Sequence, residues 1–176
     1  TDTAFDIGQM KIGKRLAVKI LNASKFALSL DATLNKSDVK LDLDHSLLNK
    51  LSEVIDQATS AFHKYDYTKA LEVTETFFWS FTDNYVELVK ERTYGKQGEE
   101  SAKSAKAALG LTIHALLRLF SPFVPFVCEE VWSWWQKGSV HLQKWPTTSE
   151  VVSNPSISAV HLETITNILA EVRKSK

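Results

Sequence analysis

Six polar or aromatic residues between Gly13 and Leu30 could contact a charged ligand. At about 100° per residue on a helix, they share one arc, while leucine, isoleucine and alanine fill the other. No acidic residue occurs from Ile7 to Leu30, so the polar arc is strongly basic. A solvated helix face usually mixes both signs of charge and lacks a large outward ring. The six candidates are Lys14, Arg15, Lys19, Asn22, Lys25 and Phe26.

These residue types match the chemistry of an unpaired nucleic-acid strand. Cations follow a phosphate backbone, an amide can read the edge of a base, and an aromatic ring can stack on a splayed base. A simpler interpretation is a surface helix whose lysines are only solvated and whose Phe26 reaches a neighbouring helix. Periodicity alone slightly favours this simpler interpretation.

The composition of the 176-residue chain is that of an ordinary globular domain, long enough to bury a sizeable core. Its 21 basic and 21 acidic residues cancel, which excludes a globally basic nucleic-acid binder but not a local basic patch. The single cysteine, Cys128, excludes an intrachain disulfide and fits a reducing compartment. No apolar run approaches the length of a membrane span. The chain opens without Met, so we read it as a fragment of a longer protein.

Hydrophobic periodicity predicts an all-α fold, a bundle of four to five helices. We expect residues 1–10 to be irregular, residues 139–145 to be extended, and residues 147–155 to form a loop. Pro122 and Pro125 should separate the fourth long helix from a short one. The short non-helical segment near residues 139–146 should interrupt the bundle. The expected helices span about 13–30, 44–65, 67–92, 99–120, 125–137 and 157–172.

No catalytic or metal-binding pattern is evident. The five histidines are scattered, and no pair has the spacing of metal ligands on a helix. Cys128 lies in an apolar run and is expected to be a small buried residue. The Glu129–Glu130 pair begins a helix and is expected to be a dipole partner or a salt-bridge group rather than a general acid/base pair. Trp132, Trp134 and Trp135 could form a stacking platform, but such density is more often core. We therefore expect a binding module without its own active site, cofactor or metal.

Four sequence segments nevertheless resemble those of a known family. They are MKIGKRLAVKILNASKF, DYTKALEVTETFFWSFTDNYVELVKER, LLRLFSPFVPFVCEEVW and SVHLQKWP. In this order they resemble the anticodon-binding domain of class I aminoacyl-tRNA synthetases, and most closely that of the valyl enzymes. The first two phrases point to the valyl member, whereas the last two are shared with isoleucyl and leucyl relatives. Lys14 stands where the family usually has Arg. A lysine keeps the positive charge but lacks the planar guanidinium group.

The resemblance implies a domain organisation: residues 1–10 link to a preceding catalytic domain, residues 11–146 form the helical anticodon-binding domain, and residues 147–176 form a loop and connector helix. It implies that the parent enzyme activates valine with ATP, although the family's two ATP-site signatures do not occur in this chain. The implied partners are valine tRNA and the catalytic domain of the same chain, with no membrane. A cytoplasmic monomer is expected.

The resemblance also changes the interpretation of residues 13–30, which become an expected anticodon-loop surface. Valine codons begin with GU, so the anticodon ends in A and then C, and these two bases should be read. Asn22 can donate and accept at either base edge, and Lys14 and Lys25 can donate to cytosine or phosphate. Arg15 and Lys19 are expected phosphate contacts, and Phe26 is a candidate for stacking. The isoleucyl or leucyl domain, and a helical protein-interaction scaffold with no RNA role, remain alternatives.

Overall fold

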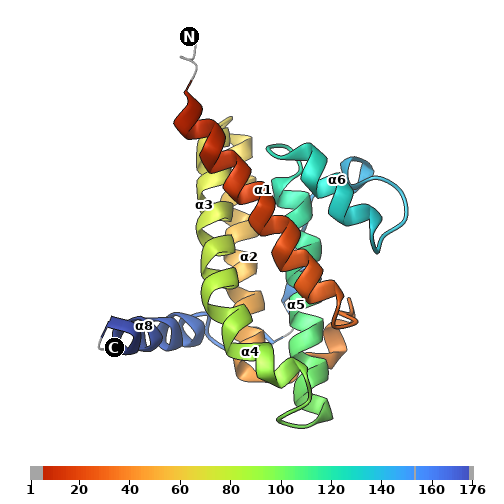
Figure 1. The fold of residues 1–176 in the computed structure, drawn as a ribbon, viewed down its shortest axis with the longest axis vertical. Coiled ribbons are helices and arrows are strands. Elements are labelled where there is room, and N and C mark those ends of the chain that lie inside the picture. The colour runs from red at the N-terminus through yellow and green to blue at the C-terminus, as the bar shows by residue number, and fades with distance from the viewer. Residues whose placement is uncertain (1–5, 153, 175–176) are drawn as a thin grey trace.

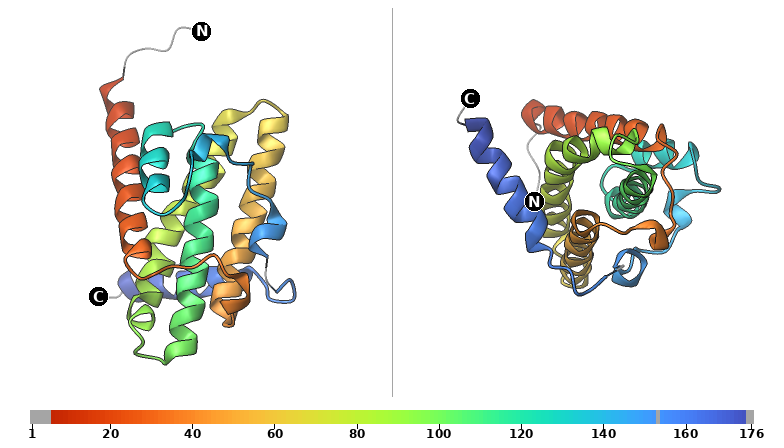
Figure 2. Two further views of the ribbon diagram at one scale, coloured as in Figure 1. Left: turned by 90° about the vertical axis from the view of Figure 1, so that its right-hand side faces the viewer. Right: turned by 90° about the horizontal axis from the view of Figure 1, so that it is seen from below.

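The computed structural model describes residues 6–152 and 154–174, and within them the protein is entirely helical, which confirms the all-α prediction. The long helices form the body of the molecule (Figure 1), and Figure 2 shows them from the side and along their length. The α-helices are α1 (Ile7–Leu28), α2 (Asp42–His63), α3 (Tyr67–Ser80), α4 (Val86–Thr93), α5 (Glu99–Phe120), α6 (Pro125–Ser133), α7 (Thr148–Val151) and α8 (Val160–Lys174).

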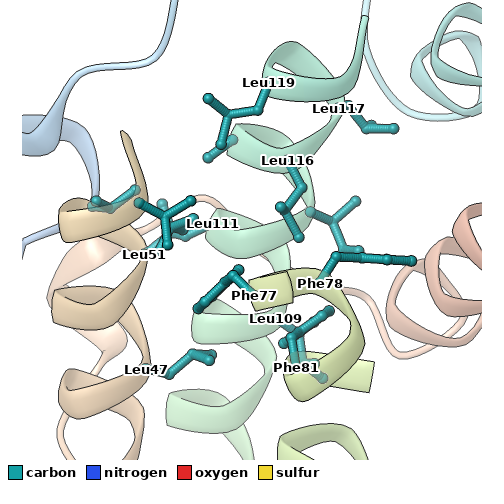
Figure 3. Packing of buried hydrophobic residues seen from close by; sticks show 14 of the residues in the cluster. Leu47, Leu51, Phe77, Phe78, Phe81, Leu109, Leu111, Leu116, Leu117 and Leu119 are labelled. Carbon is teal, nitrogen blue, oxygen red and sulfur yellow. The ribbon is translucent and has the colours of Figure 1, made fainter. Parts of the chain in front are cut away.

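The core lies between α2, α3 and α5. Leucines from α2 and α5 and phenylalanines from α3 point into the space between these helices (Figure 3). Helix α5 is buried around most of its girth, because small or apolar residues, mainly alanine and leucine, occupy most positions from Ala105 to Phe120. The ring of Phe78 meets that of Phe120 edge to face, with centroids 5.4 Å apart. The apolar face of the helix expected over residues 67–92 is therefore core, with Phe77, Phe78, Phe81, Tyr85 and Val89 buried.

The predicted helix over residues 67–92 is one continuous rod with a π turn, η2 (Phe81–Tyr85), between α3 and α4. Such a turn widens the helix by one residue and shifts the register of everything after it. Phe81 and Tyr85 both remain buried across the turn. Trp79, shortly before the turn, and Asp83, within it, face α1, since each contacts Lys19 of that helix.

Helix α1 crosses the front of the bundle, with α3 on one side and α6 on the other (Figure 1). The prediction of an irregular segment over 1–10 is wrong from Ile7 onward, because the Asp6 carboxylate accepts a hydrogen bond of 2.7 Å from the Gly8 N–H and caps the helix. Residues 1–5 lie outside the described part. The predicted apolar arc faces inward, and Leu16, Ile20 and Ala27 are buried.

The segment after α6 differs from the prediction in two places. Residues 139–145 are not extended: Val140–Leu142 form a 3-10 turn, η3, because Glu129 accepts hydrogen bonds from Ser139 Oγ and Val140 N, both at 2.9 Å. The predicted loop over 147–155 contains α7, whose first turn is closed by a 2.9 Å bond from Thr147 N to Glu150 Oε1. Residue 153 is outside the described part.

Helix α8 runs across the direction of the long helices and contacts α2 and η2 (Figure 1). It begins three residues later than predicted, at Val160, because side chains of α2 hold the preceding turn. Ser46 Oγ accepts from Leu162 N at 2.9 Å, and Asn49 Nδ2 donates to Ile157 O at 2.7 Å. Among residues 6–152 and 154–174, no helix is long and apolar enough to cross a membrane.

Candidate nucleic-acid interface

The outward face of α1 carries the six residues singled out from the sequence. Lys14, Arg15, Asn22 and Lys25 are exposed, whereas Lys19 and Phe26 are half-buried. The structure brings five of the six to two adjoining pockets between α1 and the α3–η2–α4 rod. Lys25 is the exception, because it lies on the opposite side of α1, toward α6.

The larger of the two pockets, here called the Trp79 pocket, has a volume of about 590 Å³. All the charged residues that line it are positive, and the exposed Val18 and the Trp79 ring supply its apolar surface. Such a pocket suits a nucleotide, because the base needs an apolar face and the phosphate needs cations. The lining residues are Lys11, Lys14, Arg15, Val18, Lys19, Asn22 and Trp79.

The adjoining Phe26 pocket is smaller, at about 280 Å³, and shares Lys19 and Asn22 with the first. Phe26 lines it but also packs against the hydrophobic core, so only part of its ring faces the pocket. Glu87 and Lys90 of α4 form its far wall. This pocket therefore has mixed charge, unlike the Trp79 pocket.

Lys19 makes two contacts beside these pockets. Its ammonium makes an ion pair of 2.8 Å with Asp83 Oδ1 and lies 5.8 Å from the centre of the Trp79 ring. The Asp83 carboxylate thus offsets one of the positive charges that face both pockets. The half-exposure of both partners limits the strength of this pair.

Lys25 lies on the side of α1 that faces the end of α6. Its ammonium is 5.9 Å from the centre of the Trp134 ring, which follows the end of α6. Together they line the Trp134 pocket, of about 560 Å³, with Leu28, Leu34, Trp135 and Gln136 among its other walls. Trp134 is 38% exposed, so the prediction that this tryptophan cluster is core is wrong for Trp134 and correct for the buried Trp132.

Sequence reasoning missed three residues of this surface. Lys11 was lost because the helix was expected to begin at Gly13, although it precedes Lys14 and Arg15 by one turn. Trp79 lies in the helix expected over residues 67–92, and its half-exposure follows from the place where α1 crosses α3. Asp83 faces α1 at the π turn, and the apolar period carries no signal for such a turn.

No catalytic centre emerges elsewhere in the described residues. No group of three or more His, Cys, Asp or Glu side chains within them is placed to hold a metal ion. Burial raises the pKa of the Cys128 thiol to about 12, which leaves it protonated and inert at neutral pH. Burial, helped by the nearby Arg118, lowers the pKa of His114 to about 4, and its ring stacks on Trp132 at 4.9 Å. These groups are part of the packed interior.

Comparison with known proteins agrees with the resemblance. A family model described as the anticodon-binding domain of tRNA ligase matches residues 44–176. The valine–tRNA ligase of Salinispora tropica is 56% identical over 163 residues, which cover 90% of this chain and 19% of that protein. The valine–tRNA ligase of Thermobifida fusca is 53% identical over 184 residues, which cover all of this chain and 20% of that protein.

A third relative, the valine–tRNA ligase of Cutibacterium acnes, is 49% identical over 99% of this chain and 20% of its own length. The chain therefore spans about a fifth of the length of these relatives. The family model begins at Asp44 and leaves out α1, whereas the alignment with the Thermobifida fusca protein covers the whole chain and so includes it. Because the model matches most of the chain, this chain belongs to the family of anticodon-binding domains of tRNA ligases.

Proposed function

We propose that this domain binds the anticodon loop of valine tRNA as part of a valine–tRNA ligase, and that α1 is its RNA-contacting element. The observation that carries the proposal is the Trp79 pocket, where four cations surround an exposed amide and an aromatic ring without an acidic residue in the lining. This combination supplies phosphate binding, base reading and stacking at one place.

Within this proposal, each candidate keeps the role that its position supports. Lys14 and Arg15 are exposed and contact phosphates, and Asn22 reads a base edge from the boundary of the Trp79 and Phe26 pockets. Lys19 and Lys25 stand beside indole rings. Phe26 offers a partial stacking face, because the rest of its ring is packed in the core.

The proposal includes the reaction of the longer enzyme of which this domain would be a part. Activation of valine with ATP and its transfer to tRNA would take place in the parts of the relatives that this chain does not match. The exposed apolar residues Ile7, Met10 and Ile12 at the start of α1 fit a contact with that catalytic domain. The cytoplasmic location and monomeric state expected from the sequence stay predictions.

The proposal is tested by the salt dependence of RNA binding. The titration uses an RNA hairpin that carries the anticodon loop of a valine tRNA, at several salt concentrations. Removing one phosphate contact with Arg15→Ala should make the slope of log K against log salt shallower by about 0.7. Lys103→Ala is the matched control, because Lys103 is an exposed cation of α5 paired with Glu99, away from the pockets.

Asn22→Ala tests base reading separately. It should weaken the valine hairpin by about 1–3 kcal/mol, by analogy with other base-edge contacts, and should leave the salt slope unchanged. A hairpin with a changed anticodon should lose little. Equal weakening of matched and changed hairpins would show that Asn22 reads no base. If Arg15→Ala changes the salt slope no more than Lys103→Ala does, the basic face of α1 is only solvated. That result would favour the helical protein-interaction scaffold with no RNA role.

A further inference from the structure

Two tryptophans on opposite sides of α1 share an arrangement that packing alone does not require. The Trp79 Nε1–H donates to Glu75 Oε1 at 3.0 Å, and the Trp134 Nε1–H donates to Glu130 Oε1 at 3.1 Å. In each case the glutamate precedes the tryptophan by four residues, one helical turn. Both carboxylates therefore hold an indole by its polar edge.

Each of these indoles also has a lysine of α1 above it. The ammonium groups of Lys19 and Lys25 lie 5.8 Å and 5.9 Å from the centres of the Trp79 and Trp134 rings. Both rings line open pockets of similar volume, about 590 Å³ and 560 Å³. Among the described residues, no other tryptophan has a cation above its ring.

The spacing along α1 relates the two positions. Lys19 and Lys25 are six residues apart, about 9 Å along the helix axis, and about 120° apart around it. The exposed Asn22 lies three residues from each, on the ridge between them. A strand that crosses α1 over Asn22 would thus meet an indole with its lysine on either side.

We propose that Trp79 and Trp134 are two stacking platforms for unpaired nucleobases, one on each side of α1, with Lys19 and Lys25 binding the adjacent phosphates. The inference rests on the proposed function and specifies how the loop is held. An ammonium nearly 6 Å from a ring centre is at the outer limit of a cation–π contact, so it can turn to a phosphate while a base takes the ring face. The glutamate bonds keep each ring oriented before the RNA arrives, which lowers the entropy cost of binding.

The test uses the 176-residue chain and a valine anticodon-loop hairpin that carries 2-aminopurine at single loop positions. Stacking on an indole quenches this fluorescent base. Trp79→Leu and Trp134→Leu should each abolish quenching at a different loop position and weaken binding by about 5- to 150-fold. Phe126→Leu is the matched control, because Phe126 of α6 is 91% exposed and has no lysine above its ring, so neither quenching nor affinity should change.

A second measurement avoids substitution, because Trp79 is half-buried and its loss could unfold the chain. Hairpins with 4-thiouridine at single loop positions are cross-linked by light to the unsubstituted chain, and the modified peptides are identified by mass spectrometry. Cross-links at Trp79 and Trp134 are expected, from different loop positions. Cross-links that map to neither residue, or quenching that survives both substitutions, would overturn the platforms.

The outcomes separate this inference from the function on which it rests. If the hairpin binds with the salt dependence expected for Arg15, yet neither tryptophan affects quenching, the anticodon-loop function stands and the stacking platforms fail. If the hairpin does not bind the chain at any salt concentration, both the function and the platforms are refuted.

Discussion

Asp44, in the first turn of α2, forms a fully buried ion pair with Arg92, near the end of α4, although 48 positions separate them in the sequence. The same carboxylate accepts hydrogen bonds from Tyr85 Oη, at 2.6 Å, and from Ser104 Oγ. Ser104 Oγ in turn accepts from the backbone N–H of Lys40 at 2.9 Å. One carboxylate thus joins α2, the π turn, α4, α5 and the loop before α2.

We expect Asp44→Ala to destabilise the domain by about 3–5 kcal/mol, because it leaves the Arg92 guanidinium charged, buried and unpaired. Burial, together with the Asp44 charge, raises the pKa of Tyr85, which keeps its hydroxyl protonated as a donor. Urea denaturation followed by circular dichroism measures the loss. Asp56→Ala, at an exposed position of the same helix, should change the stability by less than about 0.5 kcal/mol. Similar losses in both variants would contradict a central role for the buried pair.

The sequence predicts the rods of this fold but not the polar centre that joins them. Apolar residues at helical spacing, the proline at the start of α6 and the polar loop before α5 are local signals, because each can be read from a short stretch of sequence. Asp44 and Arg92 instead look like ordinary surface charges, because their pairing depends on how two helix ends meet. The turns near residues 140 and 148 were missed for the same reason: Glu129 and Glu150 make them by side-chain bonds that no period reveals.

The loop before α2 touches α5 at Gly110, and we expect this close approach to exclude any side chain there. A Cβ built on Gly110 would lie 2.3 Å from the backbone oxygen of Thr33. Alanine favours helices by about 1 kcal/mol over glycine, but overpacking costs about 1–3 kcal/mol. Gly110→Ala should therefore lower the free energy of unfolding by up to about 2 kcal/mol, the overpacking cost less the gain in helix propensity.

Gly13 of α1 provides the matched control for this prediction. A Cβ at Gly13 would meet nothing within 4 Å, so Gly13→Ala should stabilise the domain by up to about 1 kcal/mol. Thermal and urea denaturation of the two single variants should give changes of opposite sign. If Gly110→Ala also stabilises, the Thr33 backbone does not press on α5.

His114 should make the stability of the domain depend on pH. Its folded pKa, about 4, lies below its ordinary value of 6.5, because the ring is largely buried and Arg118 lies 3.1 Å from Nδ1. Between pH 6.5 and 4 the unfolded chain therefore binds a proton that the folded chain does not, and stability is lost as pH falls through this window. The loss should be about 1–2 kcal/mol after allowance for solvent screening of a partly exposed ring.

The measurement compares the native chain with His114→Gln. The free energy of unfolding is determined at several pH values between 4 and 7.5. Other groups contribute to the slope in both chains, so the difference between them isolates His114. The native chain should lose more stability than the variant as pH falls from 6.5. Parallel curves would contradict a depressed pKa at this position.

The candidate surface was predictable where the helix period sets it and unpredictable where another helix crosses it. A basic arc from Lys14 to Lys25 follows from 3.6 residues per turn, and the structure places its members on the outward face of α1. Trp79, Trp134 and Asp83 come from other elements, so only tertiary packing brings them to α1. The stacking role expected for Phe26 stays a prediction, because part of its ring is packed against the core.

Asp83 should restrain RNA binding, because its carboxylate holds Lys19 at 2.8 Å beside the Trp79 pocket. Phosphates that bind near Lys19 must compete with this carboxylate for the ammonium group. Asp83→Asn should therefore tighten binding of the anticodon-loop hairpin by about 1.5- to 5-fold, the range set by an exposed ion pair. The salt slope should become steeper by about 0.7, one additional phosphate contact.

Two controls decide whether Lys19 transmits the effect of Asp83. Glu91→Gln removes a similar exposed charge on α4, where Glu91 pairs with Lys96 and lines none of the three pockets, so it should leave affinity and slope nearly unchanged. In a Lys19→Ala background, Asp83→Asn should bring no gain, since the cation that it releases is gone. If Asp83→Asn still tightens binding without Lys19, Asp83 acts by general repulsion of the RNA backbone. If Glu91→Gln also tightens binding, the position of the carboxylate beside the Trp79 pocket does not matter.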